Sequence, residues 1–213
     1  MKMNQKLLAG AIALSAMAGL SVPAAQAEVS ASVGIANMYY WRGLDLGDGA
    51  ALSADINYSA GGFTVGAWTS SGDASWGTEY DIYAGYSVDI GAVSLGVGYI
   101  SYNYADMEVS PGDFAEVYAS VGVGPFKLTY MDNVANREEI GVGYDDYYYA
   151  TAELDFEKFA IKYGVHEDDL AHLDLTYKFN DKLSFMVGKV VDDADGVYND
   201  EAKLVVSLVL PIE

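Results

Sequence analysis

Apolar and polar residues alternate with a period of two through most of the chain between Val29 and Leu210. In residues 80–88, one set of alternate positions holds Tyr, Ile, Ala, Tyr and Val, whereas the other holds Asp, Tyr, Gly and Ser. Gly, Asp and Asn interrupt the alternation at intervals of about a dozen residues, which is typical of turns between antiparallel strands. The pattern predicts twelve strands, near residues 29–39, 50–60, 62–70, 78–89, 92–104, 113–122, 125–132, 146–156, 158–166, 169–179, 182–191 and 201–210.

The connections between the predicted strands alternate in length. Five of them are tight, at residues 60–62, 90–91, 122–125, 157 and 180–181, and those between them are mostly longer. Outer-membrane barrels have an even number of strands, with short periplasmic turns and longer external loops. We therefore expect an all-β fold, an antiparallel up-and-down transmembrane β-barrel of about 12 strands. Residues 28–213 would form this barrel as a single domain.

Periodicity alone does not say which set of residues faces outward. In a soluble β-sandwich or a lipocalin-like barrel, the apolar set packs into the interior. Two observations favour an apolar exterior: the polar set holds small and oppositely charged residues that suit a wet lumen, and tyrosines of the apolar set lie near strand ends, as in interfacial aromatic girdles. These tyrosines are Tyr39, Tyr58, Tyr80, Tyr99, Tyr130, Tyr163 and Tyr177. The membrane interpretation requires that Ile56, Ile82, Val117 and Leu173 do not point inward.

The amino terminus has the pattern of a cleaved signal peptide. Lys2 and Lys6 precede an apolar run at residues 7–20, and residues 25–27, Ala-Gln-Ala, form a small-x-small cleavage site. Loss of these two lysines with residues 1–27 changes the formal charge from −20 to −22. An acidic chain repels nucleic-acid phosphates, so nucleic acid is not an expected partner. The chain has no cysteine, which excludes disulfides and thiolate metal sites.

If the apolar set faces lipid, the polar set lines the lumen. Seven acids and four lysines then become pore-lining candidates, namely Asp55, Glu79, Asp81, Glu116, Glu153, Asp155 and Asp174 with Lys127, Lys162, Lys178 and Lys203. A net negative, water-filled constriction favours cations. The alternative is that these groups pair across strands and plug the barrel, as small barrels often do.

Arg42 follows the first predicted strand and lies beside Trp41. At the rim it could bind an anionic group, or it could anchor the loop by pairing with a nearby carboxylate. His166 and His172 are the only histidines, and neither belongs to an HExxH motif. Because Gly-x-Ser-x-Gly is also absent, we expect neither an enzyme nor a resident metal or cofactor.

Residues 37–43, Asn-Met-Tyr-Tyr-Trp-Arg-Gly, resemble the aromatic-Arg-Gly signature of the TorF porin family. Residues 81–86 and 116–121 resemble two further stretches of that family, and beyond residues 36–121 the similarity is one of strand pattern only. The resemblance implies an outer-membrane barrel of gamma-proteobacterial type that conducts small solutes, and it supplies no established catalytic residues to carry over. The chain departs from the usual outer-membrane ending, because it stops at Leu-Pro-Ile-Glu rather than at an aromatic residue.

The sequence thus predicts an outer-membrane porin that passes small polar or cationic solutes by diffusion, with outer-membrane lipid and lipopolysaccharide as its surroundings. Two alternatives stay open. One is a plugged outer-membrane barrel that acts through acidic external loops. The other is a soluble periplasmic β-barrel that binds an apolar ligand.

Overall fold

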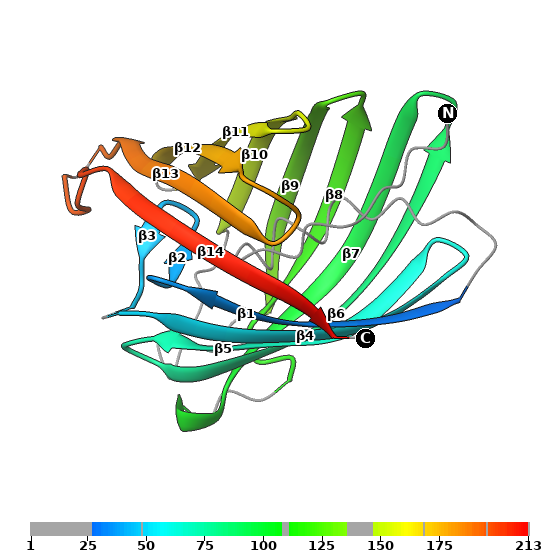
Figure 1. Ribbon diagram of the computed structural model, residues 1–213, viewed down its shortest axis with the longest axis horizontal. Coiled ribbons are helices and arrows are strands. Elements are labelled where there is room, and N and C mark those ends of the chain that lie inside the picture. Colours follow the sequence, from blue (N-terminus) through cyan, green and yellow to red (C-terminus); the bar gives the residue numbers. More distant parts are fainter. Residues whose placement is uncertain are drawn as a thin grey trace.

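Twelve antiparallel strands form a closed barrel in the computed structural model (Figure 1). The structure describes residues 27–47, 49–107, 111–135, 147–167, 169–194 and 196–212. The barrel strands are β1 (Glu28–Ala36), β4 (Ala51–Ala60), β5 (Phe63–Asp73), β6 (Gly77–Ile90), β7 (Val93–Tyr104), β8 (Ala115–Val123), β9 (Phe126–Ala135), β10 (Tyr148–Asp155), β11 (Phe159–His166), β12 (Ala171–Lys178), β13 (Leu183–Asp192) and β14 (Lys203–Ile212). Each strand pairs with its neighbours along the chain, and β1 closes the barrel by pairing with β14.

The predicted fold class and all twelve predicted strands are confirmed, with boundaries shifted by a few residues. The strand predicted to end at Leu210 continues to Ile212, and Pro211 pairs with Ser32 of β1. The pairing with β13 stops at Leu208, so Pro211 has a neighbouring strand on one side only, where proline is tolerated. The predicted signal peptide lies outside the described residues except for Ala27.

Three short elements were not predicted. β2 (Tyr40–Trp41) and β3 (Leu44–Asp45) form a separate two-stranded sheet between β1 and β4, and a 3-10 helix, η2 (Ala105–Met107), follows β7. Among the described residues, no helix is long and apolar enough to span a membrane.

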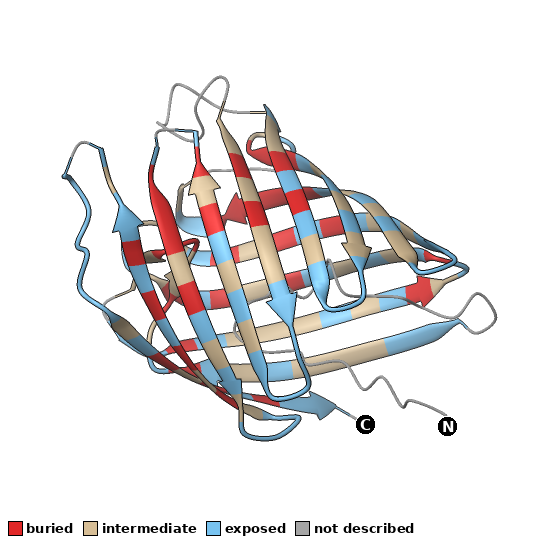
Figure 2. Ribbon diagram, turned by 90° about the horizontal axis from the view of Figure 1, so that it is seen from above, coloured by how far each residue is buried: buried red, intermediate tan, exposed pale blue. Residues whose placement is uncertain are grey.

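The apolar set of each strand faces outward. Ile56 is 56%, Ile82 43% and Val117 39% exposed, whereas Glu79 and Glu116 of the polar set are at most 1% exposed. Figure 2 shows the resulting alternation of buried and exposed residues along the strands. This direction is opposite to the one that a soluble barrel with an apolar interior requires.

Tyrosine rings lie flat against the inner wall of the barrel, over glycines of the neighbouring strand. Tyr83 pairs directly with Gly66, and Tyr118 pairs directly with Gly98. A Cβ added at Gly98 would fall on the Tyr118 ring, and one added at Gly66 would fall on the Tyr83 ring. The absence of a side chain at these glycines therefore makes room for the rings inside the lumen.

We expect Gly98→Val to destabilise the barrel by about 1–3 kcal/mol, because the new side chain overlaps the Tyr118 ring. Equilibrium unfolding of the refolded protein in lipid vesicles, followed by tryptophan fluorescence, measures the change. Gly122→Val is the matched control, because a Cβ at Gly122 meets its nearest atoms at 3.6 and 3.7 Å. Adding Tyr118→Ala to Gly98→Val should restore part of the loss, and its failure to do so would exclude the steric explanation.

Candidate functional site: an inward hairpin in the lumen

The chain folds back into the barrel directly after β1. β2 and β3 pair through Tyr40 with Asp45 and Trp41 with Leu44, which leaves Arg42 and Gly43 as a two-residue turn. Both turn residues have positive φ, +47° at Arg42 and +94° at Gly43, as a type I′ hairpin requires. We call residues 39–46 the lumen hairpin.

The lumen hairpin begins from a fixed point on the barrel wall. Asn37 donates its side-chain amide to the Leu204 carbonyl at 2.9 Å and accepts the backbone N–H of Val206 at 2.6 Å. The Asn37 side chain thus bonds one backbone carbonyl and one backbone N–H of β14, at positions beyond the end of β1. At the base of the hairpin, the Leu46 amide donates to the Tyr39 carbonyl at 2.8 Å.

Arg42 crosses the lumen and pairs with Glu116 of β8. Its Nη1 and Nη2 atoms lie 2.9 and 2.5 Å from the two carboxylate oxygens, which is a bidentate ion pair. The hydroxyls of Tyr102 and Tyr147 lie 3.2 and 3.4 Å from the same guanidinium. Arg42 was expected at the rim, either on an anionic group or paired with a carboxylate, and it lies inside the barrel, where its partner is a carboxylate of the wall.

Aromatic rings cover both sides of the guanidinium. The Arg42 Cζ atom lies 4.4 Å from the centroid of Trp41 and 4.3 Å from that of Tyr149. Burial alone would lower the pKa of Arg42, but Glu116 outweighs it and holds this pKa above its ordinary value. The pair is therefore charged, desolvated and stacked, an arrangement in which arginine is preferred to lysine.

Two tyrosines tie the lumen hairpin to other parts of the wall. Tyr39 donates a short hydrogen bond to Glu79 of β6. Tyr40 donates to Asp174 of β12 at 2.7 Å, and its ring occupies the space left by Gly188 of β13. Burial and the neighbouring Glu79 raise the pKa of Tyr39, so this hydroxyl stays a donor. Tyr39, predicted in an interfacial girdle, therefore faces the lumen instead.

Both histidines belong to the same network. The Arg42 carbonyl can only accept, so His166 Nε2 donates to it at 2.9 Å, and Nδ1 of the same ring lies 2.7 Å from the Tyr147 hydroxyl. His172 bonds Asp174 through Nδ1 at 3.1 Å and Tyr149 through Nε2 at 2.8 Å. A Cβ at Gly43 would lie 2.7 Å from that of His172, so this histidine also packs against the hairpin turn.

The lumen is packed at the ends of the strands that carry the longer connections. Every barrel strand contributes an inner-facing residue that is buried there, namely Ala36, Ala51, Ser70, Glu79, Tyr102, Glu116, Met131, Tyr149, His166, His172, Val190 and Val205. The lumen hairpin and this ring of side chains fill that half of the barrel. Within the described residues, no group of three or more His, Asp and Glu side chains is arranged to hold a metal ion.

The half near the short turns carries the remaining predicted residues, mostly in partly exposed positions. Strand pairing sets Lys127, Glu153, Lys162 and Asp174 in one row of alternating charge across β9 to β12. Lys162 lies 3.8 Å from Glu153, and Lys178 pairs with the exposed Asp155. Asp55 accepts hydrogen bonds of 2.8 Å from Tyr83 and from Asn57. Lys203, by contrast, begins β14 after the longer connection from β13, where it pairs with Gly188 and is partly buried.

The candidate residues thus fall into two groups. Glu79, Asp81, Glu116 and Asp174 surround the lumen hairpin, whereas the other acids with Lys127, Lys162 and Lys178 line the half near the short turns. Lys203 lies at the other end of its strand, where β14 begins. Sequence reasoning missed the tyrosines that complete the hairpin site. The available signal was the density of Tyr in residues 39–40, 102–104 and 147–149.

We expect Glu116→Ala to cost about 3–5 kcal/mol of unfolding free energy, because it leaves the Arg42 charge buried and uncompensated. The double change Arg42→Met with Glu116→Leu should recover most of this loss. Urea unfolding in vesicles measures both. Glu153→Ala is the control, since its partly exposed partner Lys162 makes the pair worth about 0–1 kcal/mol. Equal losses for Glu116→Ala and Glu153→Ala would contradict a desolvated anchor.

Comparisons with known proteins complete the description. No curated protein matches the sequence. Among solved structures, the KdgM porin is 12% identical, with a TM-score of 0.47, over 87% of this chain and 99% of that chain. Outer membrane phospholipase A from Escherichia coli is 10% identical, with a TM-score of 0.45, over 86% of this chain and 90% of that chain. None of these matches carries the TorF name. The family model described as "Bacterial protein of unknown function (Gcw_chp)" matches residues 21–194, and the chain therefore belongs to the Gcw_chp family.

Proposed function

We propose that this protein is an outer-membrane channel for small polar or cationic solutes, and that the lumen hairpin closes it in the conformation described here. The observation that carries the proposal is the combination of a polar, charged lumen with a closing segment that lies outside the barrel strands. Polar side-chain contacts attach this segment to the wall, and water can replace such contacts. The proposal keeps the diffusion channel of the sequence interpretation and adds that its lumen is closed in this conformation.

The outer surface supports a lipid environment. Apolar side chains are exposed on every barrel strand, a surface far larger than the apolar patches of soluble monomers. Exposed aromatic residues gather near the short turns, namely Tyr58, Phe63, Tyr86, Phe126, Phe156, Phe159, Tyr177 and Phe179. A ring of this kind suits one membrane interface. We accordingly place the protein in the outer membrane, in contact with lipid and lipopolysaccharide.

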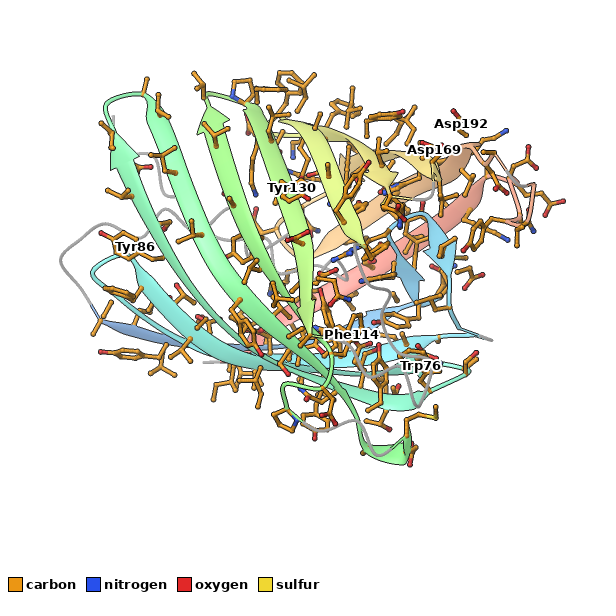
Figure 3. All side chains as sticks on the ribbon, turned by 180° about the vertical axis from the view of Figure 1, so that it is seen from behind. Trp76, Tyr86, Phe114, Tyr130, Asp169 and Asp192 are labelled. Carbon is orange, nitrogen blue, oxygen red and sulfur yellow. The ribbon has the colours of Figure 1, made fainter. Side chains whose placement is uncertain are left out.

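Acidic residues mark the opposite end. Asp192, the last residue of β13, pairs with Ala171, the first residue of β12. Asp169 precedes Ala171 by two residues and lies near Asp192 (Figure 3). A negative entrance concentrates cations and repels anions. Transport by this route needs no cofactor and no chemical step.

Ile82→Arg tests the lipid-facing direction. Ile82 lies on the outer face of β6, where a charge in the bilayer should cost about 2–4 kcal/mol. The measurement is unfolding in lipid vesicles, and Ser87→Arg on the inner face of the same strand is the comparison. A loss below about 0.5 kcal/mol for Ile82→Arg, typical of an ordinary water-exposed surface, would contradict the membrane placement.

A redox-controlled hairpin tests the channel. A Cβ at Gly72 would lie 2.7 Å from that of Tyr39, near enough for Tyr39→Cys with Gly72→Cys to bond after a shift of about 1 Å. The oxidised variant should stay silent in planar bilayers. Reduction breaks the disulfide, and the cysteine that replaces Tyr39 cannot supply the Tyr39 hydrogen bond to Glu79 that holds the hairpin. The open fraction should therefore rise about tenfold or more. A salt gradient reads the expected cation preference.

The single variant Tyr39→Cys is the control, and dithiothreitol should not change its conductance. Persistent silence of the reduced double variant, in protein that still migrates as a heat-modifiable barrel, would contradict the channel. The plugged barrel that acts through its acidic loops would then be the better description.

A further inference from the structure

Two buried carboxyl groups lie on the inner face of β6, beneath the lumen hairpin. Glu79 and Asp81 are two positions apart on β6, so both side chains point into the lumen. They are 1% and 3% exposed, and side chains two positions apart on one face of a strand are neighbours. Burial disfavours the charged form of each carboxyl group and like charges repel, so the two groups cannot both ionise without a large cost.

The charged surroundings of this pair are unfavourable. Tyr39 of the lumen hairpin donates a hydrogen bond to Glu79. The charged groups that face the pair are Asp73 of β5 and Glu116 of β8, and both are acidic.

The nearest cation of the hairpin is Arg42, and its two Nη atoms are engaged by Glu116. The second oxygen of Asp81, Oδ1, is buried and has no hydrogen-bond partner among the described residues. A second negative charge at this position would therefore be both desolvated and repelled.

We propose that Glu79 and Asp81 share one proton, and that this proton keeps the lumen hairpin closed. The inference rests on the proposed channel and adds its regulation. Loss of the proton leaves two neighbouring carboxylates in a buried site. Water must enter to solvate them, and Tyr39 of the lumen hairpin covers Glu79. The closed state is thus stable while the proton is bound, and opening is favoured as pH rises.

A proton suits this site better than a metal ion. The described residues include no cluster of three or more His, Asp and Glu arranged around a cation. The contact of the pair with the lumen hairpin is a hydrogen bond from the Tyr39 hydroxyl, which is a neutral donor.

The experiment is a pH series of single-channel recordings on the full mature chain. The open fraction of the wild type should rise with pH by at most about tenfold per unit, because one proton is released. Asp81→Asn mimics the protonated partner and should stay closed across the series. Asp55→Asn is the matched control on the lumen wall, because Asp55 accepts from Tyr83 and Asn57 and not from the hairpin, and it should keep the wild-type pH dependence.

An infrared measurement tests the proton without any conductance. The wild type at neutral pH should show the carbonyl stretch of a protonated carboxylic acid, which disappears at alkaline pH and is missing in Asp81→Asn. Absence of that band at neutral pH overturns the inference. A flat pH response in wild type also overturns it, while openings of the reduced Tyr39→Cys, Gly72→Cys variant would leave the channel itself standing.

Discussion

The bidentate pair between Arg42 and Glu116 is the interaction on which the interior of this barrel depends. A buried carboxylate and a buried guanidinium are each costly, and each is tolerable only in the presence of the other. Because Glu116 belongs to the wall and Arg42 to the hairpin, this requirement fixes the hairpin in the lumen. The positive φ of Arg42 is a strained conformation for a residue with a side chain, and the pair offsets that strain.

The remaining contacts follow from the position of that turn. Once Arg42 reaches Glu116, Tyr39 and Tyr40 lie against opposite walls, on Glu79 and Asp174 respectively. Glycines make the fit possible, since Gly188 admits the Tyr40 ring and Gly43 admits His172. The polar set of each strand faces the lumen, and tyrosines occupy much of the space there. Their rings pack like apolar residues, while their hydroxyl groups donate hydrogen bonds to the carboxylates.

The barrel could be predicted from the sequence because strand periodicity and turn residues are local signals. Each strand must alternate to present lipid on one side and water on the other, so twelve strands could be counted without knowing their partners. The inner position of Asp81 and Glu116 followed from the same rule. The rule does not predict what a lumen residue touches, because neighbours in the lumen come from strands far apart in the sequence.

The lumen hairpin was missed for a different reason. Arg-Gly is not the usual Asn-Gly or Asp-Gly of a type I′ turn, and two-residue strands are too short to show alternation. Residues 37–43 were noticed only as a family resemblance, and Arg42 was placed at the rim. A lone arginine among aromatic residues, in a chain of net charge −20, is compatible with many carboxylate partners. Only the folded barrel selects Glu116.

A closure made of polar contacts has a physical consequence that an apolar plug would not have. Replacing a buried ion pair by apolar residues is often neutral or stabilising, so the Arg42 and Glu116 pair is a poor choice if the only requirement is a stable plug. Its distinguishing property is that both partners can be solvated when water enters, whereas an apolar plug loses its burial energy on exposure. In the channel that we propose, the free-energy difference between the closed and the hydrated lumen is therefore small compared with the interactions that form it. A change of one charge at Glu79 or Asp81 would consequently decide between these two proposed states.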